Sequence, residues 1–257
     1  MEWAETFYST TGQWWAEAES DVTERDHRRA AMLTRWSGPG PQRVLELGSG
    51  YGNTAAAIAQ AGHDVIGVEL SDRFAAAERY ARADSPRFVK ADFYDVDLPG
   101  RFDVVCYWNG FGIGTDADQR RLLRRVSGEW LTDDGVALID VYNPLVWARW
   151  DGDEELRKAD PGVGYRYELG ELTHFDPVHG RAVDTWWRTD EPQRTFTQDL
   201  RCYTPADLRL LLEGTGLRLD AVVVGDTQLD LGQPHVGHQP LLADRHEYLA
   251  VLRPDAD

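Results

Sequence analysis

The stretch Val44-Leu45-Glu46-Leu47-Gly48-Ser49-Gly50-Tyr51-Gly52-Asn53-Thr54 decides the fold of this chain. Its first four residues form an apolar run with one acid, as in a buried parallel strand. The three glycines that follow let the backbone take positive φ and approach a ligand closely. Asn53 then fits the N-cap of a helix from Thr54 to Ala61 that ends at Gly62. Because a helix N-terminus presents unpaired N–H groups, we expect this turn to hold a carboxylate, a ribose or a phosphate.

The chain after this stretch continues to alternate strands with helices. We expect strands at 63–69, 87–91, 102–107 and 135–142, and helices at 73–83 and 116–130. Such alternation implies right-handed crossovers and a doubly wound parallel α/β sheet. After Tyr142 the pattern changes to polar and apolar alternation over 165–175, 181–188 and 194–203. We interpret this part as an antiparallel meander inserted into the sheet domain.

The ends of the chain complete a single predicted domain of 257 residues. Thr204 and Pro205 mark the start of a helix, and strands at 217–224 and 246–252 follow, joined by a long loop over 225–245. An amphipathic helix precedes the first core strand, with Ala30, Leu33 and Trp36 facing the core. We divide the chain into an N-terminal helical lid, a ligand-binding core, an inserted sheet that also acts as a lid, and a C-terminal part, at 1–36, 37–145, 146–203 and 204–257.

Composition excludes several classes of partner. The net charge of −17 argues against nonspecific binding to nucleic acid and to anionic membranes. No apolar run reaches the length of a membrane span, and the acidic N-terminus is unlike a signal peptide. Cys106 and Cys202 lie in apolar or aromatic stretches, so we expect buried thiols rather than a disulfide scaffold. We therefore predict a soluble, cytoplasmic protein.

Acidic residues lie in or at the ends of three successive predicted strands. Glu46 lies inside the first, Glu69 closes the second and Asp92 closes the third. An open parallel sheet binds its ligand at this edge. A dinucleotide is the competing ligand, but Asn53 replaces the third glycine of its fingerprint, and Glu46 would repel a pyrophosphate. Glu46 suits an ammonium group, Glu69 two ribose hydroxyls and Asp92 an adenine amino group.

At these residues the sequence resembles the class I methyltransferases that use S-adenosylmethionine (SAM). The resemblance covers about residues 40–145 and includes Phe102-Asp103-Val104-Val105 and Leu131-Thr132-Asp133-Asp134-Gly135. It implies a seven-stranded, mostly parallel Rossmann-like sheet whose last strand, 246–252, is antiparallel. It also implies SAM as cofactor, no metal, and cofactor contacts from Glu46, Gly48, Ser49, Gly50, Gly52, Asn53, Glu69, Leu70, Asp92, Phe93 and Tyr107.

The acceptor of the methyl group is expected beyond the fourth and fifth strands. The Asn-Pro-Pro-Tyr signature of methylation on bases and glutamine is absent there, which favours a small molecule. We name as substrate-binding candidates Tyr8, Trp14, Trp108, Asn109, Tyr142, Asn143 and His174.

Candidate catalytic groups are only weakly marked. His174 is a candidate base, although a surface histidine is the simpler interpretation, and Tyr142 is a candidate for orienting the acceptor. His235 and His238 have a spacing that a metal accepts, but a third ligand is not evident and we favour a plain loop. Asp140 with Asn143 suggests the metal-dependent catechol type of methyltransferase, but the acidic cluster that would support this type is not evident.

The predicted function is methyl transfer from SAM to O or N of a small-molecule acceptor in specialised metabolism. In-line displacement needs alignment and exclusion of water more than a strong base. The alternatives are carbon methylation, a noncatalytic SAM- or nucleotide-binding regulator, and a dinucleotide oxidoreductase. The many tryptophans suit an apolar pocket, although core packing or a homodimer face explains them equally well.

Overall fold

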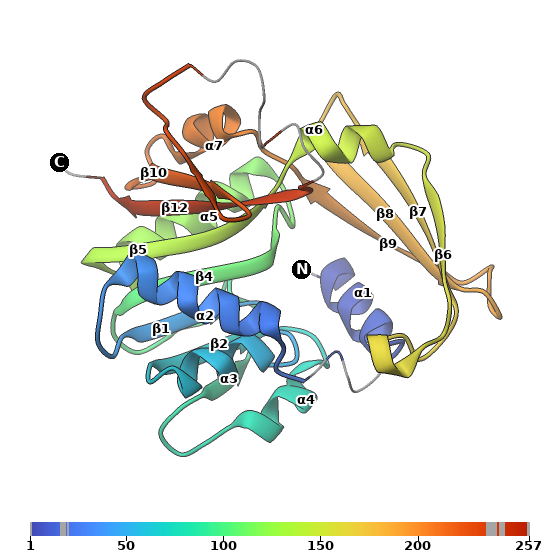
Figure 1. Ribbon diagram of the computed structural model, residues 1–257, viewed down its shortest axis with the longest axis horizontal. Helices are drawn as coiled ribbons and strands as arrows, with labels where there is room; N and C mark the ends of the chain where they lie inside the picture. Colours follow the sequence, from blue (N-terminus) through green and yellow to red (C-terminus); the bar gives the residue numbers. More distant parts are fainter. Residues whose placement is uncertain (1, 16–18, 20, 235–240, 242–244, 256–257) are drawn as a thin grey trace.

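The computed structural model describes residues 2–15, 19, 21–234, 241 and 245–255. These residues form an eight-stranded sheet and a separate four-stranded sheet (Figure 1). In spatial order the large sheet contains β11 (Thr227–Leu229), β10 (Leu217–Val224), β12 (Glu247–Pro254), β5 (Leu131–Tyr142), β4 (Phe102–Phe111), β1 (Arg43–Leu47), β2 (Asp64–Glu69) and β3 (Arg87–Lys90).

The order and direction of these strands confirm the predicted α/β class. Strands β3, β2, β1, β4 and β5 run parallel, and β12 lies antiparallel between β5 and β10. The eighth strand was not predicted: the sequence analysis assigned 225–245 to a loop, but β11 pairs antiparallel with β10. Thr227-Gln228-Leu229 is too short to give a periodic signal, and only the neighbouring edge makes it a strand.

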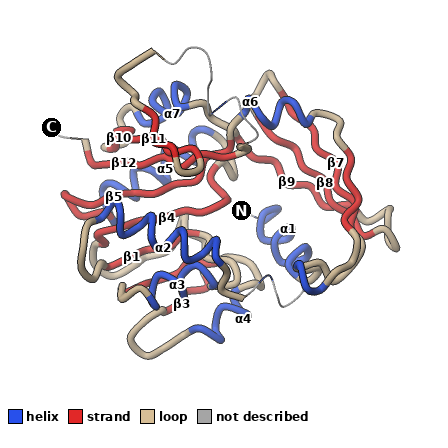
Figure 2. The backbone as a smooth tube through the Cα atoms, in the orientation of Figure 1, coloured by secondary structure: helices blue, strands red, loops and turns tan. Residues whose placement is uncertain are grey.

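Helices cover both faces of the large sheet (Figures 1 and 2). One face packs on α2 and α3 and the other on α5 and α7, so the large sheet lies between two apolar cores. In β1, Val44 faces α2 and α3, whereas Leu45 and Leu47 face α5 and α7. The helices are α1 (Glu2–Gly12), α2 (Glu24–Ser37), α3 (Asn53–Gln60), α4 (Phe74–Ala77), α5 (Asp116–Arg125), α6 (Pro144–Trp147) and α7 (Pro205–Leu212).

Several helices differ from their predicted extents. The helix predicted over 73–83 is a single turn, α4, followed by a 3-10 turn at Glu78–Tyr80, because the backbone turns extended at Ala81. The helix predicted over 116–130 is α5 followed by a π-helical turn at Val126–Trp130. The start of α7 is as predicted, since Thr204 accepts from the Asp207 N–H and Pro205 is the first helical residue.

The inserted sheet packs beside the large one and is larger than predicted. Its strands are β6 (Glu154–Arg157), β7 (Leu169–Asp176), β8 (Arg181–Arg188) and β9 (Thr195–Arg201), all antiparallel, and β6 had not been expected. Helix α1 lies between the two sheets (Figure 1). Ala4 of α1, Tyr142 of β5 and Leu200 of β9 share a third apolar cluster, which joins the insertion to the core.

Two further expectations concern the whole chain. Cys106 and Cys202 are both buried and free, as predicted. Within the described ranges, no helix is long and apolar enough to cross a membrane.

Candidate active site

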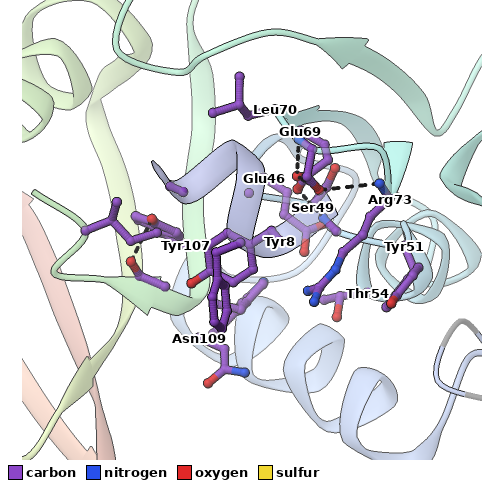
Figure 3. A pocket seen from close by; sticks show the side chains of 18 of the residues that line it. Tyr8, Glu46, Ser49, Tyr51, Thr54, Glu69, Leu70, Arg73, Tyr107 and Asn109 are labelled. Carbon is purple, nitrogen blue, oxygen red and sulfur yellow. Dashed lines mark hydrogen bonds between the residues drawn. The ribbon is translucent and has the colours of Figure 1, made fainter. Parts of the chain in front are cut away.

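A cavity of about 320 Å³ lies at the carboxyl ends of β1, β2 and β4 and is also lined by α1; Figure 3 shows side chains of its lining. Both predicted groups of residues contribute to its lining. From the predicted cofactor contacts it receives Glu46, Gly48, Ser49, Gly50, Asn53, Glu69, Leu70, Asp92, Phe93 and Tyr107. From the predicted acceptor contacts it receives Tyr8, Trp108, Asn109 and Tyr142.

The glycine turn is held tightly against the end of β2. Gly48, Gly50 and Gly52 have φ of +63°, +55° and +78°. The Gly50 N–H donates to Glu69 Oε2 at 2.7 Å, and the Ser71 N–H and hydroxyl donate to Glu69 Oε1 at 2.7 and 2.5 Å. Glu69 therefore fixes the turn before any ligand arrives, and the carboxylate stays at the cavity wall.

Gly52 and Asn53 differ from the prediction in how the helix begins. Gly52, in the left-handed region, takes the N-cap position of α3 in place of Asn53. Gly52 is not among the residues that line the cavity; a Cβ there would lie 2.8 Å from both Ala77 Cβ and Phe88 Cζ, so close packing requires the glycine. Asn53 donates its side-chain amide to the buried Asp26 of α2 at 3.2 and 3.3 Å, so it joins α2 to α3.

Glu46 is a buried acid at the floor of the cavity. It is 3% exposed, and its Oε2 has no hydrogen-bond partner among the described residues. Burial raises the pKa of Glu46 to about 8, although the positive charge of Arg29 opposes the rise. The hydroxyl of Ser49 is also buried and unpartnered within the described chain. Since unpaired buried polar groups are costly, both atoms indicate a place for a polar ligand.

Arg29 of α2 lies near the floor of the cavity and was missed by sequence reasoning. Its Nη2 pairs with Asp140 Oδ2 at 3.1 Å, and its guanidinium carbon lies 5.2 Å from the Trp108 ring centroid. Burial raises the pKa of Asp140 to about 7, with a further rise from the negative charge of Glu247. Asp140 thus forms an ion pair with Arg29; among the residues that the structure describes, no group of three or more His, Cys, Asp or Glu side chains is placed to hold a metal ion.

Asp92 and Phe93 form the wall after β3. Asp92 Oδ1 accepts from the Tyr94 N–H at 2.8 Å, which fixes the carboxylate in a tight turn. The Phe93 ring packs against Tyr107, with the ring centroids 5.3 Å apart. These contacts leave an acid and an aromatic wall side by side at the end of the third strand, where an adenine was predicted.

The acceptor side of the cavity is built from α1, β4, β5 and the inserted sheet. The Tyr142 hydroxyl donates to Asn109 Oδ1 at 3.0 Å, and the Tyr8 hydroxyl donates to Gln198 Oε1 at 3.3 Å. Burial raises the pKa of Tyr8 to about 12 and holds that of Tyr142 well above its usual range. Both phenols are therefore protonated at neutral pH and serve as hydrogen-bond donors rather than bases.

Three predicted acceptor contacts lie away from the cavity. His174 is exposed on β7, where its Nδ1 lies 3.1 Å from Asp151 Oδ1, so it is not positioned as the base. Asn143 is buried, caps α6 and donates to the Leu241 carbonyl at 2.7 Å. Trp14 packs edge-on against Phe196, and its neighbour Trp15 lines the cavity instead. The candidate metal ligands His235 and His238 lie outside the described residues.

The end of α1 is fastened to the cofactor side of the cavity. The Tyr51 hydroxyl donates to the Gly12 carbonyl at 2.9 Å, and the Asp72 N–H donates to Ser9 Oγ at 3.0 Å. The Arg73 guanidinium carbon lies 5.2 Å from the Tyr8 ring centroid and 5.1 Å from that of Tyr51 (Figure 3). Arg73 and Gln198 were missed by sequence reasoning, because no local pattern links residues that only the tertiary fold brings together. Tyr51 lies in the glycine turn and Trp186 is one of the tryptophans expected to suit a pocket, but neither was named as a site residue.

Comparison with known proteins identifies one domain of the chain. Residues 44–135 match the family described as "Methyltransferase domain". The chain contains a class I SAM-dependent methyltransferase domain. The matched range begins in β1 and ends in β5, so it includes the glycine turn, Glu69 and Asp92 but neither α1 nor the inserted sheet.

Relatives of this methyltransferase domain include a protein of similar sequence and several solved structures. The cypemycin N-terminal methyltransferase of a Streptomyces species is 31% identical over 112 residues, which are 43% of this chain and 46% of that protein. The chain thus spans about half the length of this relative. The CcbJ methyltransferase of Streptomyces caelestis superposes with a TM-score of 0.71 at 22% identity, over 98% of this chain and 99% of its own. The sugar N-methyltransferase KedS8 of Streptoalloteichus sp ATCC 53650 gives a TM-score of 0.61 at 23% identity, over 91% and 89%.

The residues of the cavity fit SAM, which this family implies. A sulfonium ligand with an α-amino group would supply the cation that the unpartnered Glu46 Oε2 lacks. The left-handed Gly48 lies so near the Tyr107 ring that an added Cβ would approach it at 3.3 Å, so at this position the turn presents only its backbone. Glu69 at the end of β2 and Asp92 after β3 also line the cavity, so their carboxylates could accept hydrogen bonds from such a ligand.

Proposed function

We propose that this protein transfers the methyl group of SAM to a nitrogen of a small-molecule acceptor. The observation that carries the proposal is the buried, unpartnered carboxylate of Glu46 at the floor of a cavity that also holds Glu69 and Asp92. Glu46 holds the ammonium group of SAM, Glu69 its ribose and Asp92 its adenine. When bound, SAM supplies an electrophilic methyl group on a sulfonium.

The acceptor side supports nitrogen over oxygen and carbon. A neutral amine is nucleophilic enough to attack the methyl group directly and releases its proton to water after the transfer, whereas a hydroxyl or a carbon acid is a weak nucleophile until a base takes its proton. Tyr8 and Tyr142 stay protonated, and the cavity lining contributed by the described residues contains no histidine. Tyr8, Tyr142 and Asn109 therefore orient the acceptor, and α1 with the inserted sheet excludes water.

Printed names of similar structures agree with this proposal. KedS8 is named a sugar N-methyltransferase, and MtfA, with a TM-score of 0.54, is named a glycopeptide N-methyltransferase. A third structure, with a TM-score of 0.55, is a Burkholderia thailandensis N1-methyltransferase with bound 1,6-didemethyltoxoflavin and S-adenosylhomocysteine. The methyl acceptors in these names differ widely, so the names support nitrogen as the acceptor atom but do not favour one particular substrate.

Labelled SAM tests the proposal. The protein is incubated with methyl-labelled SAM and fractionated metabolite extracts, and each labelled product is identified by mass spectrometry. We expect an N-methylated small molecule. Binding of SAM without turnover in any fraction would favour a regulator, and an O- or C-methylated product would overturn the assignment of nitrogen.

A further inference from the structure

Gln198 of β9 reaches the acceptor side of the cavity from the inserted sheet. It lines the cavity with Trp186 of β8 and Tyr8 of α1. Its Nε2 donates to Asp184 Oδ2 at 2.8 Å, and its Oε1 accepts from the Tyr8 hydroxyl at 3.3 Å. The amide nitrogen of Gln198 thus donates to an acid inside the inserted sheet, and the amide oxygen accepts from a hydroxyl in the cavity.

Asp184 dictates which end of the amide faces the cavity. Asp184 is 2% exposed. Its carboxylate accepts a hydrogen bond from the Trp186 indole N–H at 2.6 Å as well as the one from Gln198. Burial raises the pKa of Asp184, while its hydrogen bonds with Trp186 and Gln198 oppose the rise. The indole N–H of Trp186 can only donate, so Asp184 Oδ2 accepts there; with the NH₂ of Gln198 on the same oxygen, the carbonyl oxygen of Gln198 faces the cavity.

The carbonyl oxygen of Gln198 has capacity for a second donor. An amide oxygen has two lone pairs, and the bond from Tyr8 is long at 3.3 Å. The Trp186 ring beside it is fixed by Asp184 and packs edge-on against Trp15, with the ring centroids 5.5 Å apart. The site therefore offers one acceptor atom, held in a fixed direction, between aromatic walls.

We infer that Gln198 is a specificity-determining residue that accepts a hydrogen bond from an N–H or O–H group of the methyl acceptor, and that Asp184 positions it. This inference rests on the proposed function, since it concerns the acceptor of that same cavity. It assigns to the acceptor a hydrogen-bond donor that contacts the inserted sheet. It also gives the insertion, which lies outside the matched methyltransferase range, a role in substrate choice.

The first test uses the free protein and needs no acceptor. In ¹⁵N NMR spectra, the Gln198 side-chain NH₂ and the Trp186 indole N–H should be protected from exchange with water and shifted by their bonds to Asp184. Asp184→Asn should remove both signatures while circular dichroism stays unchanged. Fast exchange of the Gln198 NH₂ in the unaltered protein would show that it faces the cavity and would overturn the inference.

The second test separates recognition of the acceptor from binding of SAM. The probe is the extract fraction that the unaltered protein labels from methyl-labelled SAM. Gln198→Leu and Asp184→Asn should each lower kcat/KM for that fraction by about tenfold, mainly through KM, with the affinity for SAM unchanged. Thr197→Ala is the matched control, because Thr197 precedes Gln198 but bonds Thr185 at 2.9 Å on the exposed face.

The outcomes distinguish this inference from the proposed function. Full kcat/KM in Gln198→Leu would show that Gln198 does not bind the acceptor. A loss of affinity for SAM as large as the loss for the acceptor would show the same. If the unaltered protein labels no fraction, the proposed function fails by itself, while the exchange measurement still decides how Gln198 is oriented.

Discussion

The two sides of the cavity are built in different ways. On the cofactor side, Glu46, Gly48, Gly50 and Glu69 lie within 24 consecutive residues, on strands that are neighbours in both sequence and space. On the acceptor side, Tyr8 meets Gln198 across 190 positions, and the contact depends on α1 packing beside the inserted sheet. The proposed site for the methyl donor thus comes from one compact motif, whereas the proposed site for the acceptor comes from segments that are distant in sequence. The variants below test whether the two sides function separately.

Removal of the Glu69 carboxylate should have the largest effect on the cofactor side. Glu69→Ala loses the acceptor for the Gly50 N–H and for Ser71, so the turn relaxes and a ribose contact disappears. We expect the affinity for S-adenosylhomocysteine to fall about 100-fold, as for the loss of two hydrogen bonds to a charged group. Calorimetry measures it, with Glu155→Ala on the edge strand β6 as control. An affinity within twofold of the original would refute the role of Glu69.

A methyl group on the glycine turn should destabilise the core. Gly52→Ala must keep φ near +78° and place its Cβ 2.8 Å from Ala77 Cβ and Phe88 Cζ. Gly62→Ala is the matched control, since its φ is +96° and nothing lies within 4 Å. The free energy of unfolding, from urea denaturation, should fall by about 1–3 kcal/mol more for Gly52→Ala than for the control. Equal losses would mean that the packing around Gly52 is not tight.

Asp92 should contribute less than Glu69. Asp92→Ala removes the proposed acceptor for the adenine amino group and the bond to the Tyr94 N–H at 2.8 Å. We expect about a tenfold loss of affinity for S-adenosylhomocysteine, because a single hydrogen bond to a charged group is lost. Asp92→Asn, which can still cap the turn, separates the two contributions. If Asp92→Asn binds as weakly as Asp92→Ala, the carboxylate itself contacts the ligand.

Tyr142→Phe should leave the cofactor side untouched. The variant deletes only the hydroxyl that donates to Asn109 Oδ1 at 3.0 Å. We expect the affinity for S-adenosylhomocysteine to stay within about twofold, since the variant breaks no bond on the glycine turn. Methyl transfer to the labelled extract fraction should slow by about tenfold, because Asn109 loses the hydrogen bond that orients its side chain in the acceptor side of the cavity. A large loss of cofactor affinity would show that the two sides are coupled.

The sequence predicted most of the core and little of the acceptor side, for a physical reason. Buried parallel strands need apolar runs, and a turn with positive φ needs glycine, so both leave local signals around Glu46 and Glu69. Gly52 shows what these local signals do not contain. The sequence shows a glycine at this position, but not that Ala77 and Phe88 pack too closely against it to admit a side chain. His174 was chosen for its chemistry alone, and its strand register turns it to solvent. Gln198 carries no signal, since only Asp184 and Tyr8 give it a direction.

Calorimetry of the intact protein tests the central claim most directly. At pH 7, Glu46 with a pKa of about 8 is mostly protonated in the free protein, and an ammonium group beside it favours the ionised form. Titration of S-adenosylhomocysteine in two buffers of different ionisation enthalpy should therefore show binding with release of close to one proton, and Glu46→Gln should abolish the release. NAD should give no binding heat. Binding of NAD but not of SAM or S-adenosylhomocysteine would contradict the account, and binding without proton release would refute the role of Glu46.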